Sequence, residues 1–371
     1  MPPDIENPRI LILRFSALGD IAMTAPVVRA SALKHPNVLF LVASAPMLEP
    51  LFTGIPNLQF ESVDTKEFTG IAGFFRLYRK LRHFRPTHLF DLHIVLKTYF
   101  LCSLFFVLHG TPIFCVKEGK RQRRQLTSAH RKRLHPLPSM ITKYTEVFIR
   151  AGFPPASVGN TPASVDNTTA SVGNPPASLD NTHLSDCIAP PFKTTLEERG
   201  GLRYIGVAPF AKHPTKEWPV EKMEGVIEQL ARSGKYRVFL FGGGILERVI
   251  LKNWEQRYHN TKCVAGSVDF AHELTLIRDM ELFISMDSAN MHFASYMGVP
   301  VLSIWGGTHP YAGFYGWRQA PENAIQTDLA CRPCSVFGKK SCRLGTFACF
   351  QTITVELVLR RIEVFFEQGT T

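Results

Sequence analysis

Short apolar runs alternate with segments of helical spacing along both halves of the chain. In the first half, the runs that predict strands are residues 9–14, 38–43, 60–63 and 88–92. Helices are expected at residues 46–52, 73–84 and 142–151. In the second half, strands are expected at 204–208, 236–241, 282–286 and 299–305, and helices at 220–232, 272–278, 289–297 and 355–367. Strands that alternate with helices favour parallel, doubly wound sheets.

The segment around Asp287 combines a strand end with a helix start. Asp287 follows the apolar run 282–286, and we expect the Ser288 hydroxyl to cap the next helix by accepting from its first-turn amides. Ligands of such units bind at the carboxyl ends of the strands, where helix N-termini attract anions. With Ala289 and His292 in the helix, the pattern suits a nucleotide pocket. The structural alternative is that Asp287 and Ser288 only cap the helix and that His292 is a core residue.

Polar residues also follow other strands. Asp20 lies just after Gly19, behind the first strand, where it could serve chemistry or simply interact with a helix dipole. Lys97 follows the strand at 88–92 and could face the same edge or be a solvated helix residue. The loop 210–219 contains Lys216, and Glu247 follows a glycine cluster that lacks the spacing of a dinucleotide fingerprint.

The length of 371 residues allows two domains, and no signal peptide is expected because the first residues carry acids and prolines. The longest apolar run, 99–108, is about half of what a bilayer span needs. We therefore expect a cytoplasmic protein that touches a membrane at most peripherally. The net charge of +11 could serve nucleic acid, an anionic membrane or an acidic substrate.

Much of this charge lies in residues 117–135, where Glu118 is the single acid among many Lys and Arg residues. Such a run is typical of a mobile, solvated loop. It lacks the interleaved aromatics that stack on bases, so we expect no nucleic-acid partner, and a polyanionic acceptor or anionic lipid fits better. The predicted acceptor-binding residues are Lys97, Arg121, Arg123 and Arg124.

A heptapeptide repeat with Pro, Gly and Asn spans residues 155–182. Its composition cannot bury a core, which predicts a disordered linker. The expected organisation is a first domain at 1–153, a linker at 154–200 and a second domain at 201–371.

Four cysteines lie close together in the sequence, and eight occur in all. One CxxC with two more distant cysteines is compatible with structural zinc, although reduced thiols in a surface excursion are the default. The four are Cys331, Cys334, Cys342 and Cys349.

Five short motifs in order resemble the family 9 glycosyltransferases, the heptosyltransferases of lipopolysaccharide core assembly. They are SALGDIAMTAPVVRA after the first strand, DLHIVLKT at 91–98, TKEWP at 215–219, GGILE at 243–247 and DSANMHFA at 287–294. Two departures are His93, where the family usually has Gln, and Ala289, where it has Gly. The resemblance implies two Rossmann-like domains of the glycosyltransferase B type with a cleft between them. It implies that the domain at 1–153 is acceptor-binding and that the domain at 201–371 is nucleotide-sugar-binding.

The resemblance also implies roles for individual residues. Asp20 would be the general base, and Lys216 would neutralise the departing diphosphate. The donor would be held by Lys216, Glu247, Val268, Asp287, Ser288, Ala289 and His292.

The implied reaction is inverting, metal-independent transfer of heptose from ADP-heptose to a Kdo-lipid A or core oligosaccharide acceptor, without a cofactor. No Asp-x-Asp pair occurs in the chain, which agrees with metal-independent transfer. One alternative is the same fold with another nucleotide sugar of cell-envelope glycan synthesis. Another is a catalytically silent polyanion-binding protein.

Overall fold

The computed structural model describes residues 7–117, 119–156 and 200–368, and these form two compact units. The first unit contains residues 7–117 and 140–156, and the second contains residues 119–139 and 200–368. The chain therefore enters the second unit, returns to the first and enters the second again, whereas a single passage through a linker at 154–200 was expected. Apart from residues 155 and 156, the repeat at 155–182 lies outside the described residues.

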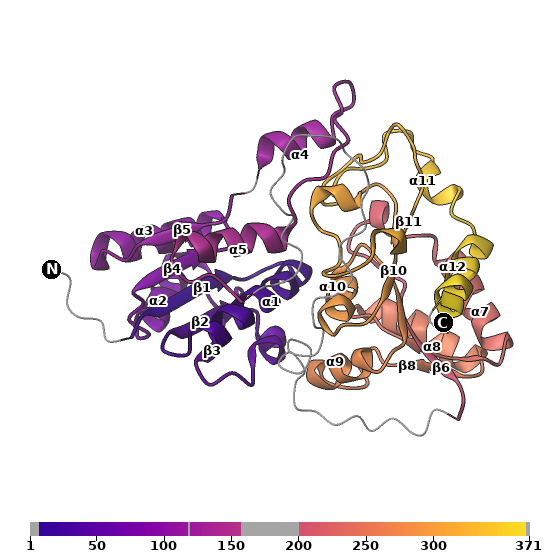
Figure 1. Cartoon of the computed structure of the whole chain (residues 1–371), viewed down its shortest axis with the longest axis horizontal. Helices are drawn as coiled ribbons and strands as arrows, with labels where there is room; N and C mark the ends of the chain where they lie inside the picture. Colours follow the sequence, from indigo (N-terminus) through magenta and orange to yellow (C-terminus); the bar gives the residue numbers. More distant parts are fainter. Residues whose placement is uncertain (1–6, 118, 157–199, 369–371) are drawn as a thin grey trace. The chain divides into compact units, whose positions relative to one another are not determined.

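The first unit is built on a five-stranded parallel sheet with the order β3-β2-β1-β4-β5. Its strands are β1 (Arg9–Arg14), β2 (Leu39–Ser44), β3 (Leu58–Ser62), β4 (His88–Asp91) and β5 (Ile113–Cys115). The helices around it are α1 (Leu18–Lys34), the 3₁₀ helix η1 (Pro46–Phe52), α2 (Gly70–Arg82), α3 (Leu96–His109) and α5 (Met140–Arg150) (Figure 1).

Apolar strand residues hold these helices in place. Side chains of α2 and α3, among them Leu77, Leu81 and Phe105, share one buried cluster with Leu11 and Leu89 of the sheet. Helix α1 packs against η1 and α5 instead. The sheet is thus apolar on both faces, as expected for parallel strands covered by helices on each side.

The second unit contains a six-stranded parallel sheet with the order β11-β10-β9-β6-β7-β8. Its strands are β6 (Arg203–Ala208), β7 (Tyr236–Leu240), β8 (Thr261–Cys263), β9 (Leu282–Met286), β10 (Val301–Trp305) and β11 (Ala324–Gln326). Its helices are α4 (Lys120–Leu126), η2 (Pro214–Lys216), α7 (Val220–Arg232), α8 (Ile245–Arg257), α9 (Phe270–Arg278), α10 (Ala289–Tyr296), η3 (Pro310–Ala312), η4 (Pro321–Asn323), α11 (Ala348–Gln351) and α12 (Val355–Gln368).

The two doubly wound parallel sheets confirm the predicted fold class. The apolar runs at 9–14 and 282–286 and the helix at 220–232 form with the expected bounds. Helix α3 was not predicted, because its apolar residues lie all around it and give no clear helical stripe. Among the residues that the structure describes, no helix has the length and apolar character that a bilayer crossing requires.

Part of the run 117–135 is helical and packed rather than a plain solvated loop. Residues 120–126 form α4, and Lys132 Nζ donates to the carbonyls of Ala330 and Arg332, both at 2.8 Å. Arg343 donates to the carbonyl of Thr127 at 2.8 Å. Charge density along the sequence suggested self-repulsion, but backbone carbonyls and aromatic rings of the second unit accommodate this charge.

Candidate functional site

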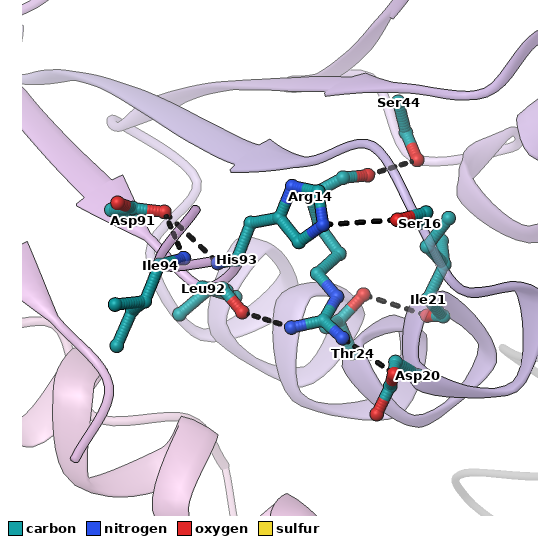
Figure 2. Close-up of polar contacts among 10 residues, drawn as sticks. All are labelled: Arg14, Ser16, Asp20, Ile21, Thr24, Ser44, Asp91, Leu92, His93 and Ile94. Carbon is teal, nitrogen blue, oxygen red and sulfur yellow. Dashed lines mark hydrogen bonds and ion pairs between the residues drawn. The ribbon is translucent and has the colours of Figure 1, made fainter. Parts of the chain in front are cut away.

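In the first unit, an ion pair joins the end of β1 to the first turn of α1. Arg14 Nη2 lies 2.6 Å from Asp20 Oδ2, and the two side chains are 9% and 19% exposed (Figure 2). Both residues lie at the carboxyl edge of the sheet, because Arg14 pairs with Ser44, the last residue of β2. This edge is where ligands of doubly wound sheets bind.

Further contacts fix the position of Arg14. Its Nη1 donates to the carbonyl of Leu92, and the Ser44 hydroxyl donates to the Arg14 carbonyl at 2.6 Å. The guanidinium therefore joins the segment after β4 to the Asp20 carboxylate, and Ser44 at the end of β2 holds the Arg14 backbone. The sequence analysis assigned Arg14 no role. A charged residue at the end of an apolar run could have indicated a side chain at the carboxyl edge of the sheet.

His93 lies beside this pair, on the segment that follows β4. Its Nε2 is 3.0 Å from Ser16 Oγ, and Asp91 Oδ1 accepts from the backbone amides of His93 and Ile94 at 2.9 and 3.0 Å. Burial and the nearby Arg14 charge lower the pKa of His93 to about 4. The imidazole is therefore neutral at pH 7, and it can accept or donate a hydrogen bond at this edge.

Lys97 comes from the first turn of α3 and is half-buried. Its Nζ donates to the carbonyl of Phe68, and burial lowers the pKa of this ammonium. Its predicted role in acceptor binding stays a prediction.

In the second unit, Lys216 and Asp287 form a second ion pair. Lys216 Nζ lies 2.8 Å from Asp287 Oδ2, and the Thr308 hydroxyl donates to the same oxygen at 2.7 Å. Asp287 follows β9 and Thr308 follows β10, so both lie at the carboxyl edge of this sheet. The sequence predicted Lys216 and Asp287 as separate ligands of one donor, and the structure brings them together.

The segment that carries Lys216 is held on both sides. Trp218 is fully buried, and its Nε1 donates to the carbonyl of Ile353 at 3.2 Å. Thr215 donates from its hydroxyl to the carbonyl of Gly338 at 2.7 Å and accepts at its own carbonyl from the Gly307 amide at 2.7 Å. The predicted polar loop 210–219 is thus anchored around its lysine.

The turn after β10 is fixed by an arginine that sequence reasoning missed. Arg332 is 3% exposed, and it donates to the carbonyls of Gly306 at 2.5 Å and Thr308 at 2.9 Å. A Cβ on Gly306 would overlap the Phe350 ring, so only glycine fits there. These contacts hold the turn in place. No local pattern indicated a buried arginine in the cysteine-rich segment.

Ser288 precedes α10 as predicted, but it does not cap the helix. Its side chain makes no capping hydrogen bond, and its Oγ lies 3.2 Å from Ser285 Oγ. The capping expectation is therefore wrong, because the neighbouring hydroxyl competes for Ser288. Ala289 begins the helix, and His292 is buried in it.

Glu247 lies in the first turn of α8, where its Oε2 accepts from the amides of Gly243 at 2.7 Å and Gly244 at 3.0 Å. Nearby Glu217 accepts from the Ala211 amide at 2.8 Å, and burial, together with the Glu247 charge, raises the pKa of Glu217. Glu217 was not singled out in the sequence.

Val268 lies in the loop between β8 and α9 and is 38% exposed. Glu273 lies in the first turn of the following helix, α9, and burial raises its pKa to about 7 although Arg248 opposes that shift. A carboxyl that titrates near neutrality is an unpredicted feature of this part of the second unit.

The three predicted arginines of α4 differ in environment. Arg121 and Arg124 are exposed, whereas Arg123 is 8% exposed and lies 5.3 Å from the ring centroids of both Phe314 and Phe337. Arg123 therefore stabilises the packing of α4 by cation–π contacts, while the other two face solvent.

The cysteine-rich segment is exposed in its middle, at residues 339–341 and 343–346, and buried at its two ends. Cys334 and Cys349 are buried, and a small cavity beside Thr215 and Gly307 is lined by Cys331, Cys334, Cys342 and Cys349 as free thiols. Within the described ranges, no group of three or more His, Cys, Asp or Glu side chains is arranged to hold a metal ion. The structural-zinc alternative stays a prediction.

Two doubly wound parallel α/β units, each with charged side chains at the carboxyl edge of its sheet, are the architecture of the glycosyltransferase B fold. The family model for glycosyltransferase family 9 (heptosyltransferase) matches residues 74–344. The chain belongs to this family.

Among curated proteins, the chain is 32% identical over 130 residues to lipopolysaccharide heptosyltransferase 3 of Escherichia coli, and the match covers 34% of this chain and 36% of that protein. The matched part thus spans about a third of that relative's length.

Solved structures share the fold over nearly the whole chain. The family 9 glycosyl transferase of Veillonella parvula has a TM-score of 0.67 at 18% identity, covering 97% of this chain and 98% of that one. The E. coli heptosyltransferase WaaC with ADP-2-deoxy-2-fluoro heptose has a TM-score of 0.64 at 15% identity, covering 96% and 99%.

Proposed function

We propose that the chain transfers heptose from ADP-heptose to the Kdo or inner-core region of lipopolysaccharide, with inversion and without a metal ion. The observation that carries this proposal is the Lys216–Asp287–Thr308 cluster at the carboxyl edge of the second sheet. It offers a cation where a nucleotide diphosphate would depart. Family membership supports the reaction class, and the structural similarity to WaaC with ADP-2-deoxy-2-fluoro heptose supports an ADP-linked donor.

Asp20 is proposed as the general base. Its carboxylate takes the proton of the acceptor hydroxyl while that oxygen forms a bond to the anomeric carbon of the donor. The bond from this carbon to the diphosphate oxygen breaks, and ADP leaves with the electron pair. Arg14 would be a positioning residue, because it orients the Asp20 carboxylate through their 2.6 Å contact.

Lys216 is proposed to neutralise the negative charge that grows on the departing diphosphate. In the absence of that charge, Asp287 is its counter-ion at 2.8 Å. The remaining proposed donor contacts are Glu247, Val268, Ser288, Ala289 and His292. Because the Ser288 side chain makes no capping bond, the first-turn amides of α10 are available to phosphate oxygens.

The acceptor is proposed to be anionic, and Lys97, Arg121 and Arg124 are its proposed contacts. Arg123 is better assigned to folding, since it lies buried against two aromatic rings. A peripheral position on the cytoplasmic face of a membrane belongs to the same proposal. The alternative donors are other nucleotide sugars of cell-envelope synthesis.

The decisive experiment is mass spectrometry after incubating the full chain with ADP-heptose and a Kdo-lipid A acceptor. We expect an acceptor product heavier by one heptosyl unit, together with ADP, in the presence of EDTA. If only another nucleotide sugar supported transfer, the proposed donor would be wrong. Loss of activity in EDTA with an intact fold would overturn the metal-free mechanism. Binding without any turnover would favour the silent polyanion-binding alternative.

A further inference from the structure

Helix α3 carries large apolar side chains on two opposite faces. One face packs into the first unit through Thr98, Leu101, Cys102 and Phe105. The other is open to solvent, with exposed fractions of 73% for Leu96, 65% for Tyr99, 54% for Phe100, 59% for Phe106 and 75% for Val107. A helix that is apolar all round normally has protein or lipid on each side. A contiguous exposed apolar patch of this kind marks an interaction surface.

Helix α2 runs beside α3 in the same direction. Lys97 in the first turn of α3 bonds to the carbonyl of Phe68, just before α2. At the other end, Tyr78 Oη lies 2.6 Å from His109 Nε2, and the Tyr78 ring lies 5.2 Å from the Phe105 ring. The start of α2 is therefore next to the start of α3.

The first two turns of α2 add apolar side chains to this region. Ile71 is 80% exposed and Phe75 is 50% exposed. We call seven exposed apolar residues of the two helices the α2–α3 apolar face. They are Ile71, Phe75, Leu96, Tyr99, Phe100, Phe106 and Val107.

Positive charge accompanies this face. The two helices contain no Asp or Glu, and α2 exposes Arg76, Arg79 and Arg82. Lys80 is the exception among the exposed cations of α2, because Glu61 neutralises it at 2.6 Å. An apolar face with a cationic margin is complementary to a bilayer whose headgroups are anionic.

We propose that the α2–α3 apolar face docks the protein on an anionic lipid bilayer. The 14 residues of α3 make it about 21 Å long, and its inner face stays packed on the first unit. The helix therefore lies in the plane of the interface, with Tyr99 and the arginines at headgroup depth. This inference rests on the proposed function in one respect: a lipid-linked acceptor gives the docking its purpose.

A second copy of the chain fits this face less well than lipid. A symmetric dimer would place the same patch on both sides of the interface. The arginines of α2 would then face their own counterparts without a carboxylate from either helix, and such like-charge contacts oppose association. An anionic bilayer satisfies the same arginines.

Fluorescence can test whether lipid contacts this face. The four native tryptophans, Trp218, Trp254, Trp305 and Trp317, are at most 5% exposed, so Phe100→Trp adds an accessible reporter. With phosphatidylglycerol-containing vesicles, its emission should shift to shorter wavelength and be quenched by brominated acyl chains. High salt should weaken binding as it screens the arginines. An unchanged Phe100→Trp spectrum at saturating vesicle concentration would overturn the proposal.

Sedimentation with vesicles can identify the residues responsible. The combined variant Tyr99→Ser, Phe100→Ser and Val107→Ser should lower partition by about two orders of magnitude, because three large apolar side chains no longer leave water. The matched control, Leu33→Ser, Met47→Ser and Ile149→Ser, removes three exposed apolar residues from elsewhere in the first unit and should partition like the unmodified chain. Equal losses in both would overturn the assignment to this face.

Two further measurements separate the alternatives. Light scattering without lipid should give a monomer, and a dimer that the α3 variant dissociates would assign the face to a second copy. The α3 variant should keep its transfer rate to a water-soluble, lipid-free acceptor and lose rate only with vesicle-bound acceptor. Vesicle binding without any glycosyl transfer would refute the proposed function and leave the docking intact.

Discussion

Lys216 Nζ lies 2.8 Å from Asp287 Oδ2, and this contact joins the segment after β6 to the end of β9. The two side chains are 16% and 4% exposed, so the pair is largely removed from water. Removing either partner from such a pair leaves a charge without its counter-ion. The pair is thus part of the fold as well as a candidate for chemistry, and the two roles can be separated by experiment.

Asp287→Ala should lower the free energy of unfolding by about 3 kcal/mol, because it leaves the Lys216 ammonium and the Thr308 hydroxyl without their shared acceptor. Urea denaturation would measure the change. The exposed Glu322 offers a control, since Glu322→Ala removes a carboxylate from the same unit and should change stability little. Equal stability of the Asp287 variant would mean that the pair contributes nothing to folding.

Lys216→Ala should reduce turnover on the order of 10²–10³-fold, because the departing diphosphate loses its neutralising cation. Added Mg²⁺ should not restore the rate. Lys212→Ala is the matched control, since Lys212 is an exposed cation of the same loop and should be dispensable. Comparable losses in both variants would remove the special role of Lys216, and melting curves would exclude unfolding as the cause.

Asp20→Asn should lower turnover about 10²–10⁴-fold while donor affinity hardly changes, because the amide keeps the shape of the side chain but cannot take a proton. Steady-state kinetics and donor titration would check both parts. Glu67→Gln neutralises an exposed acid of the first unit and should have no effect. Wild-type turnover in the Asp20 variant would exclude this residue as the base.

The three arginines of α4 should divide into two groups. Arg121→Gln combined with Arg124→Gln should raise the Michaelis constant for an anionic acceptor, mainly at low salt, and leave stability unchanged. Arg123→Gln should instead lower the free energy of unfolding by about 1–2 kcal/mol, because it removes a desolvated cation from two aromatic rings. If Arg123→Gln changed only the acceptor kinetics and the double variant lowered stability, burial would not determine which arginine binds acceptor and which supports the fold.

The stability of the chain should increase with pH between about 4 and 6.5. The folded state lowers the pKa of His93 from 6.5 to about 4, so within this window the unfolded state binds a proton that the folded state does not. The contribution is complete above pH 6.5 and is lost as pH falls towards 4. His93→Gln should flatten this part of the profile in urea titrations, whereas a parallel profile would contradict the assigned burial of the imidazole. Some slope should remain in the His93→Gln variant, because the pKa of His309 is also lowered by burial.

Local pattern predicted the strands and many of the helices, because alternating apolar segments encode a parallel sheet directly. It also placed Asp287 at the carboxyl end of a strand, whereas Lys216 was singled out by the resemblance of its loop to the family motif. It did not predict the roles of Arg14 and Arg332, because each of these side chains donates to backbone carbonyls that lie far away in the sequence. The capping role expected of Ser288 was wrong for a related reason: the neighbouring Ser285 hydroxyl, not the helix, is its partner.

The packing of residues 119–139 on the second unit determines how the chain can be divided. A protease cut within 157–199 would separate residues 200–368 from the rest of the chain, while residues 119–139 of the second unit would stay covalently attached to the first unit. A fragment that ends at residue 156 would contain Arg123 and Leu126 without Phe314 and Phe337, the rings that Arg123 packs against. The halves expressed separately should therefore aggregate or bind each other, so a split protein would work only if residues 119–139 were supplied together with the second unit.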